Sequence, residues 1–218
     1  MISNQFVYII ESPSKYNLLD GIMEGKALLE SLCLAKIPTS YNLVIDREML
    51  KISLTSKLIK ECQNSGDKLP LLHLSMHGNE EGIELSNKDF VSWQELWELI
   101  APLSNYMKGG LIICMSTCHG SYGSYMANFE NHNLTYASLI GNISTTNWAD
   151  AAVAYITFYH LYFKELSIDK CVETMKAASG DDGFRLHWGN EVRWQLRELN
   201  FEVTQLRQAL GMNQPTAS

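Results

Sequence analysis

The stretch that decides the fold is Leu71–Gly78, "LLHLSMHG", together with its counterpart Leu111–Gly120, "LIICMSTCHG". Each begins with an apolar run of strand length and ends in a histidine or a cysteine close to a glycine. In an open parallel sheet, residues just past the carboxyl ends of neighbouring strands converge on one crevice. His77 and Cys118 are therefore expected to meet at one edge of a sheet.

A cysteine and a histidine that meet in such a crevice can form a catalytic dyad. A nearby imidazolium stabilises the attacking thiolate, and the same imidazole can later activate water. We therefore predict His77 and Cys118 as catalytic residues, with the backbone amides of Gly78 and Cys118 as the oxyanion hole. His119 is a weaker candidate for the base, because adjacent side chains on extended backbone diverge. The structural alternative is a turn at His77 and a small apolar core residue at Cys118.

Metal binding is a competing use of the same residues. On a strand, residues four apart lie roughly 13 Å from each other, so His73 with His77, or Cys114 with Cys118, cannot share one zinc ion. We therefore expect His73 and Cys114 in the core. A site made of His77, Cys118 and His119 stays open as an alternative, and no metal or cofactor is predicted.

The rest of the chain alternates apolar runs of strand length with helical patterns, which predicts an α/β fold with a mostly parallel sheet. Besides 71–75 and 111–115, strands are expected at 6–10, 41–45 and 137–142, with a short ribbon at 83–85. Helices are expected within 18–37, 50–65, 91–100, 149–166 and 168–179, with Ser92 and Glu95 as a capping box. One domain covers 1–218, with a C-terminal helix at about 190–210 and a flexible tail at 212–218.

The composition of the chain argues against direct nucleic-acid binding and against membrane contact. The 218 residues are 46% apolar and 19% charged, as in a soluble globular protein. The net charge of -7, from 17 Lys+Arg against 24 Asp+Glu, and the lack of a basic run argue against direct nucleic-acid binding. No segment has the length of a membrane span or the form of a signal peptide, so we expect no membrane contact and a cytoplasmic location. The five unevenly spaced cysteines indicate reduced thiols.

The first strand suggests one alternative function. The stretch 6–15, "FVYIIESPSK", resembles the opening of the Toprim domain of type IA topoisomerases, where a strand ends in a catalytic glutamate. A Toprim site also needs a later Asp-x-Asp pair to bind Mg²⁺. Asp46 and Glu48 match that pair only in part, and the acidic charge does not suit a DNA enzyme.

The segments "LHLSMHG" (72–78) and "LIICMSTCHGS" (111–121) resemble the caspase-like cysteine peptidases of clan CD, which include caspases, metacaspases, separases and bacterial CHAT peptidases. "CHG" at 118–120 is close to the Cys-His-Ser-Gly of metacaspases, and 139–178 is similar to the CHAT pattern. The resemblance covers about 5–180. It implies a three-layer caspase-like sandwich, with a mostly parallel sheet of about six strands and helices on both faces.

The resemblance also implies a cysteine endopeptidase and a place for its substrate. In this family the pocket for the residue before the cleaved bond lies at the end of the first strand, two residues before the nucleophile and after the fifth strand. Those positions are Glu11, Ser116 and the stretch 142–150. Glu11 and Asp150 would form an acidic wall that favours Arg or Lys. The alternatives are a solvated turn carboxylate for Glu11 and a helix-start residue for Asp150.

The expected partners are a protein or peptide substrate and a regulatory protein or activating ligand, since a free cytoplasmic peptidase is hazardous. The charged final helix lies outside the resemblance and is the expected docking element. A bacterial stress-response or antiviral defence setting would suit a small CHAT-like protein. The main alternative is a catalytically idle caspase-like binding module.

Overall fold

The protein is described by a computed structural model that covers residues 4–129 and 134–209, with side chains as far as residue 206. The strands are β1 (Gln5–Ser12), β2 (Thr39–Leu43), β3 (Leu69–Asn79), β4 (Gly82–Glu84), β5 (Phe90–Ser92), β6 (Ile112–Ser116), β7 (Ser138–Asn142) and β8 (Phe184–Trp188). The α-helices are α1 (Lys15–Asp20), α2 (Glu24–Leu34), α3 (Arg47–Ile52), α4 (Leu58–Asn64), α5 (Trp93–Tyr106), α6 (Trp148–Tyr162), α7 (Ile168–Ser179) and α8 (Gly189–Ala209). A π-helix, η2 (Ser53–Lys57), joins α3 to α4, and a 3-10 helix, η3 (Gly120–Asn128), follows β6.

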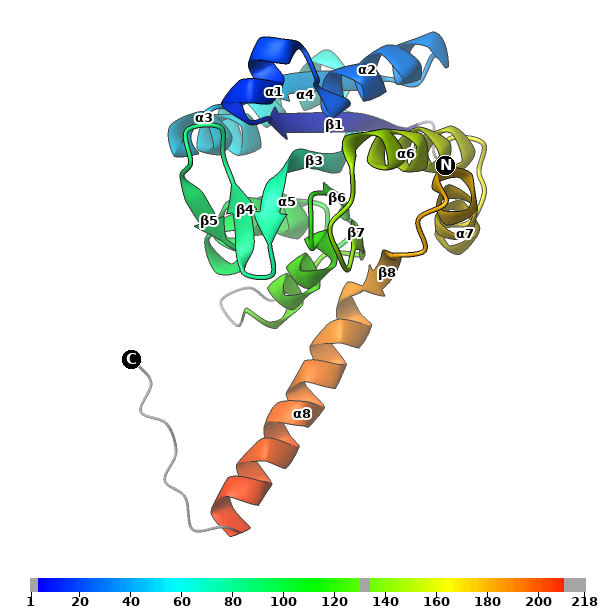
Figure 1. The fold of residues 1–218 in the computed structure, drawn as a ribbon. Coiled ribbons are helices and arrows are strands. Elements are labelled where there is room, and N and C mark those ends of the chain that lie inside the picture. Colours follow the sequence, from blue (N-terminus) through cyan, green and yellow to red (C-terminus); the bar gives the residue numbers. More distant parts are fainter. Residues whose placement is uncertain (1–3, 130–133, 210–218) are drawn as a thin grey trace.

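The central sheet has the strand order β2-β1-β3-β6-β7-β8, and β4 and β5 extend β3 as a small antiparallel ribbon. Its neighbouring strands are parallel from β2 to β7, and β8 runs antiparallel to β7 at the edge. Helices cover both faces (Figure 1). The predicted mostly parallel sheet of about six strands with helices on both faces is confirmed.

Alternate residues of the buried strands supply two separate cores, as expected for a sheet covered on both sides. In β1, Tyr8 and Ile10 point to the core that contains Trp97 of α5. Val7 and Ile9 point to the opposite core, which is formed with α2, α6 and α7. This strict alternation makes the strands read as continuous apolar runs in the sequence.

Local signals placed several helix ends correctly. Ser92 and Glu95 form the predicted capping box at the start of α5. The helix α7 spans 168–179 as predicted and ends at Gly180, whose φ of 71° is the left-handed conformation that glycine adopts easily. The expected final helix is α8, whereas the tail predicted at 212–218 lies outside the described residues.

Several features differ from the sequence prediction, among them a break between α1 and α2 within the segment 18–37 and a start of β2 at Thr39. The short strands β5 and β8 were not predicted, because "FVS" precedes a helix directly and "FRLHW" mixes charged with apolar residues. The helix expected over 50–65 contains the π-helical segment η2. The strand β3 continues to Asn79, so that His77 lies inside the strand and pairs with Glu84 of β4 rather than following the strand.

The helix α8 projects away from the rest of the molecule (Figure 1). Within the described ranges, no helix combines the length and the apolar character that a bilayer crossing requires.

Candidate active site

A small pocket opens where β3 and β6 end. Its volume is ≈ 80 Å³, and its lining consists of Met76, His77, Ser116, Thr117, Cys118, Thr146 and Trp148. The structure therefore brings His77, Cys118 and Ser116 together, as expected from the sequence. Thr146 and Trp148 belong to the stretch 142–150 that the family resemblance placed near the substrate.

The register of two parallel strands explains why the imidazole and the thiol share this pocket. Ser75 of β3 pairs with Ser116 of β6. His77 and Cys118 each lie two residues further along the chain, so they leave the sheet at the same level. Gly78 makes the close approach possible, because a Cβ there would overlap Thr117 Oγ1 and would lie 3.4 Å from the Cys118 carbonyl oxygen.

His77 lies in a largely apolar environment. Its ring contacts the edge of Trp148, with 5.5 Å between the ring centroids. Burial, and then the positive charge of Lys88, lower the pKa of His77, and the carboxylate of Glu84 opposes them. The Nε2 atom is buried and has no hydrogen-bond partner among the described residues. A neutral imidazole with a free ring nitrogen can serve as a base.

The thiol of Cys118 is positioned by the loop between β7 and α6. Its Sγ donates to the carbonyl oxygen of Thr146 across 3.8 Å. The N–H of the next residue, His119, donates to the Ser144 carbonyl in the same loop, at 3.0 Å. The loop therefore contacts the strand end at the candidate nucleophile and at the residue that follows it.

Asp181, in the turn between α7 and β8, holds that loop in place. Its Oδ2 accepts hydrogen bonds from Asn142 Nδ2 at 2.7 Å and from Thr146 Oγ1 at 3.1 Å. Its Oδ1 accepts from the Gly183 N–H at 2.8 Å. The sequence prediction missed Asp181, because a carboxylate in the turn "GDDG" carries no local signal for a contact with residues 35 and 39 positions earlier.

His119 is not among the residues that line this pocket. Its φ of 57° turns the backbone into the left-handed region, and its ring lies beside Tyr122 with 6.0 Å between centroids. Its Nδ1 lies 3.9 Å from Glu80 Oε1. The geometry thus agrees with the preference for His77 over His119.

Glu11 has a different role from the substrate contact expected of it. Its carboxylate is buried and accepts hydrogen bonds from the N–H groups of Gly25 and Lys26, at 2.9 and 3.1 Å, and from the Tyr41 hydroxyl at 2.8 Å. Burial raises the pKa of Glu11, against the lowering effect of these hydrogen bonds. Glu11 does not belong to the lining of the pocket and instead binds the start of α2.

Asp150 also lies outside the pocket lining. Its N–H donates to Asn147 Oδ1 at 2.9 Å, and its carboxylate accepts from the Asn147 side-chain amide in the first turn of α6. It is the helix-start residue that the alternative interpretation described. The expected acidic wall of Glu11 and Asp150 is therefore a wrong prediction for this pocket, whereas Ser116 does line it.

The residues of the Toprim alternative are used in other ways. Asp46 caps α3, because its Oδ1 accepts from the Met49 N–H at 2.8 Å. The following residue, Arg47, forms an ion pair with Glu95 at 2.8 Å. Over residues 4–129 and 134–206, no three His, Cys, Asp or Glu side chains are grouped closely enough to hold a metal ion.

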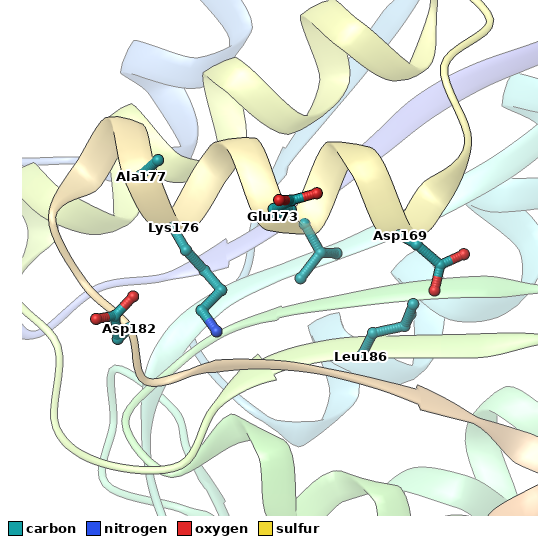
Figure 2. A pocket seen from close by; sticks show the side chains of 7 residues that line it. Asp169, Glu173, Lys176, Ala177, Asp182 and Leu186 are labelled. Carbon is teal, nitrogen blue, oxygen red and sulfur yellow. The ribbon is translucent and has the colours of Figure 1, made fainter.

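A second, larger pocket of ≈ 370 Å³ lies between α7 and β8. Figure 2 shows Asp169 at one end and Asp182 with Lys176 at the other, while Leu186 comes from the edge strand. Among the residues that the structure describes, its lining has no cysteine, histidine or serine. This pocket therefore offers no nucleophile and no imidazole for hydrolysis.

No family model and no curated protein matches this sequence. Among solved structures, the crystal structure of the Arg specific cysteine proteinase gingipain R (RGPB) superposes with a TM-score of 0.51 at 8% sequence identity. The match covers 81% of this chain and 41% of that chain, so the present chain corresponds to less than half of that protein. The similarity at this identity is one of fold: the chain has a mixed α/β architecture like that of this cysteine proteinase.

Proposed function

We propose that this chain is a cysteine endopeptidase in which Cys118 is the nucleophile and His77 is the general base. The observation that carries the proposal is the shared pocket, to which adjacent parallel strands contribute an imidazole and a thiol at the same level of the sheet. The likeness in fold to a cysteine proteinase supports it.

The proposed reaction begins with an uncharged imidazole at His77 and an uncharged thiol at Cys118. The neutral imidazole of His77 takes the proton from Sγ of Cys118, and the thiolate attacks the carbonyl carbon of the peptide bond. The N–H groups of Gly78 and Cys118 stabilise the oxyanion that forms. The imidazolium then protonates the leaving amine, and a thioester remains on Cys118. His77 next removes a proton from water, which attacks the thioester and releases the acid and the free thiol.

The lining suggests how the substrate residue is received. The hydroxyl of Ser116 is buried and, like that of the neighbouring Ser75, has no hydrogen-bond partner among the described residues. Only Ser116 lines the pocket, and its hydroxyl can both donate and accept a hydrogen bond, so a polar side chain would satisfy it. No preference for Arg or Lys is proposed, since Glu11 and Asp150 are engaged elsewhere.

The size of the pocket supports control by a partner or a ligand. Its ≈ 80 Å³ is small beside the roughly 300 Å³ at which ligand pockets begin. A peptide therefore needs the loop that carries Thr146 to move outward, together with the start of α6 at Trp148. We include in the proposal that a regulatory protein or small ligand stabilises this open arrangement.

Labelling with a thiol-directed peptidyl fluoromethyl ketone tests the proposal. The wild type should react and Cys118→Ala should not, whereas Cys33→Ala should react like the wild type although Cys33 is the more exposed thiol. His77→Ala should slow the labelling by about a hundredfold, in the range of general-base effects, and His119→Ala should leave it nearly unchanged.

Cleavage of protein substrates is the second measurement. Co-expression with candidate substrates should give new fragments with the wild type and none with Cys118→Ala. Equal labelling of the wild type and Cys118→Ala, or fragments that persist in Cys118→Ala, would contradict the proposal. A folded protein that binds a partner equally well with and without Cys118 and cleaves nothing would be the idle binding module.

A further inference from the structure

The helix α8 carries an apolar row that the body does not cover. Its first turns contact the body, where Val192 packs against the core and Arg193 Nε donates to the Ala127 carbonyl at 2.8 Å. Further along, Leu199 and Leu206 are 55% and 61% exposed. Figure 1 shows that this part of α8 extends beyond the sheet and the other helices.

The spacing of the row is that of a coiled coil. Leu196, Leu199, Val203 and Leu206 follow one another in alternating steps of three and four residues. This spacing corresponds to positions a-d-a-d of a heptad repeat, which places all four on one stripe of the helix. We call these four residues the α8 seam. A seam of this kind is covered by another helix with the same spacing.

We propose that the α8 seam pairs with the α8 seam of a second copy of this chain, as a parallel two-stranded coiled coil. The residue types at the seam support a coiled coil of two helices. A β-branched residue at a with leucine at d favours parallel dimers. The outer layers of the seam have this pattern, with Val203 at a and with Leu199 and Leu206 at d, while Leu196 occupies the first a position.

The flanking positions support the parallel orientation. In a parallel pair, a residue at g faces the residue at e of the partner helix five positions further on. Glu202 is at g, and the sequence places Arg207 five positions later at e, so opposite charges meet twice. In an antiparallel pair, the e positions face each other, and Arg193 would approach Arg207. Like charges would oppose that arrangement.

The proposed dimer places both bodies at the same end of the coiled coil, because each body is joined to the N-terminal end of its α8. The seam covers only about two heptads, so the dimer is expected to dissociate on dilution. This inference does not depend on the peptidase proposal, since no catalytic residue takes part in it.

Sedimentation of the full chain over a wide concentration range tests the pairing. The wild type should pass from monomer to dimer as the concentration rises, and Leu199→Glu with Leu206→Glu should stay monomeric. Phe201→Glu is the matched control, because Phe201 is 64% exposed and lies on the side of α8 opposite the seam. This substitution should leave the dimer unchanged. A wild type that is monomeric throughout, or a Phe201→Glu that dissociates as readily as the seam variant, would overturn the proposal.

Exchanging the flanking charges tests the orientation. Glu202→Arg alone should weaken the dimer several-fold, because arginine would then face arginine. Adding Arg207→Glu should restore the wild-type dissociation constant, since the opposite charges meet again in the reverse order. A double variant whose dimer is weaker than that of Glu202→Arg alone would exclude the parallel pairing. Thermal unfolding should be similar for all these variants, because the exchanged residues lie on the projecting part of α8.

Discussion

At the scale of single residues, Glu11 shows how a carboxylate at a strand end can stabilise the fold rather than bind a substrate. The N–H groups at the start of α2 have no partners within their own helix, and two of them bind the two oxygens of Glu11. The helix dipole also favours a negative charge at this end. Gly25 is needed for this contact, because a Cβ there would lie 3.0 Å from Glu11 Oε2.

His77 yields a pH prediction at the same scale. The proposed mechanism needs the neutral imidazole, and the lowered pKa of His77 keeps it neutral below its ordinary value of 6.5. We expect kcat/KM to stay high through pH 6.5 and to fall only as the pH drops through the lowered pKa.

Substitutions at two charged neighbours of His77 test the direction in which its pKa is shifted. Lys88→Met removes a positive charge that lowers the pKa of His77, so the fall in kcat/KM should move to higher pH. Glu84→Gln removes the opposing carboxylate, so the fall should move to lower pH. Both shifts should be small and should shrink in high salt, because Lys88 and Glu84 are partly exposed. Shifts in the same direction for both variants would contradict the assignment of the base.

At the scale of elements, the loop between β7 and α6 depends on the turn between α7 and β8. Asn142 ends β7 and Thr146 lies in the loop, and both donate to one oxygen of Asp181. Because Thr146 also accepts from the Cys118 thiol, the turn influences the candidate nucleophile without touching it. Asp181 is thus a positioning residue.

The variant Asp181→Asn tests this role. An amide offers a single acceptor oxygen for three donors, so the loop should lose its fixed geometry. We expect the labelling rate of Cys118 to fall about tenfold to a hundredfold, as is typical when a reacting group is misplaced by about 1 Å. The free energy of unfolding should fall by only about 1–2 kcal/mol.

Asp182→Asn is the matched control, because it makes the same chemical change one residue later at an exposed side chain. It should leave both the labelling rate and the stability near those of the wild type. If Asp181→Asn and Asp182→Asn label equally fast, the turn does not position the thiol.

At the scale of the whole molecule, the core between the sheet and the layer of α2 and α6 contains a buried contact between a carboxylate and an imidazole. Glu24 Oε2 of α2 lies 3.5 Å from His73 Nε2 of β3, and neither side chain is exposed. His73 Nδ1 also forms a hydrogen bond with the Tyr159 hydroxyl of α6, at 3.1 Å. His73 thus connects two helices to the sheet and is a core residue, as predicted from its place on the strand.

Unfolding in urea would measure how much the contact between Glu24 and His73 contributes to the free energy of unfolding. The single variant His73→Leu leaves the Glu24 carboxylate buried without a partner, and we expect it to cost about 3–5 kcal/mol. The double variant Glu24→Met, His73→Leu replaces both polar groups with apolar ones and should recover most of that loss. If His73→Leu is as stable as the wild type, or if the double variant is less stable than His73→Leu, the two side chains do not contribute jointly to the free energy of unfolding.

The sequence by itself determined the class of fold, the alternation of strands and helices and several helix boundaries. These features follow from local patterns, because apolar runs, caps and glycines act through neighbours in the chain. It also predicted that His77 and Cys118 would meet, since parallel strands end at a common edge, and the family resemblance added Ser116. Only the tertiary structure decided that Glu11 binds α2, that Asp181 holds the loop at the thiol, and that "FRLHW" forms the edge strand β8. Those contacts join residues far apart in the chain, and hydrogen bonds at such separations leave no periodic trace in the sequence.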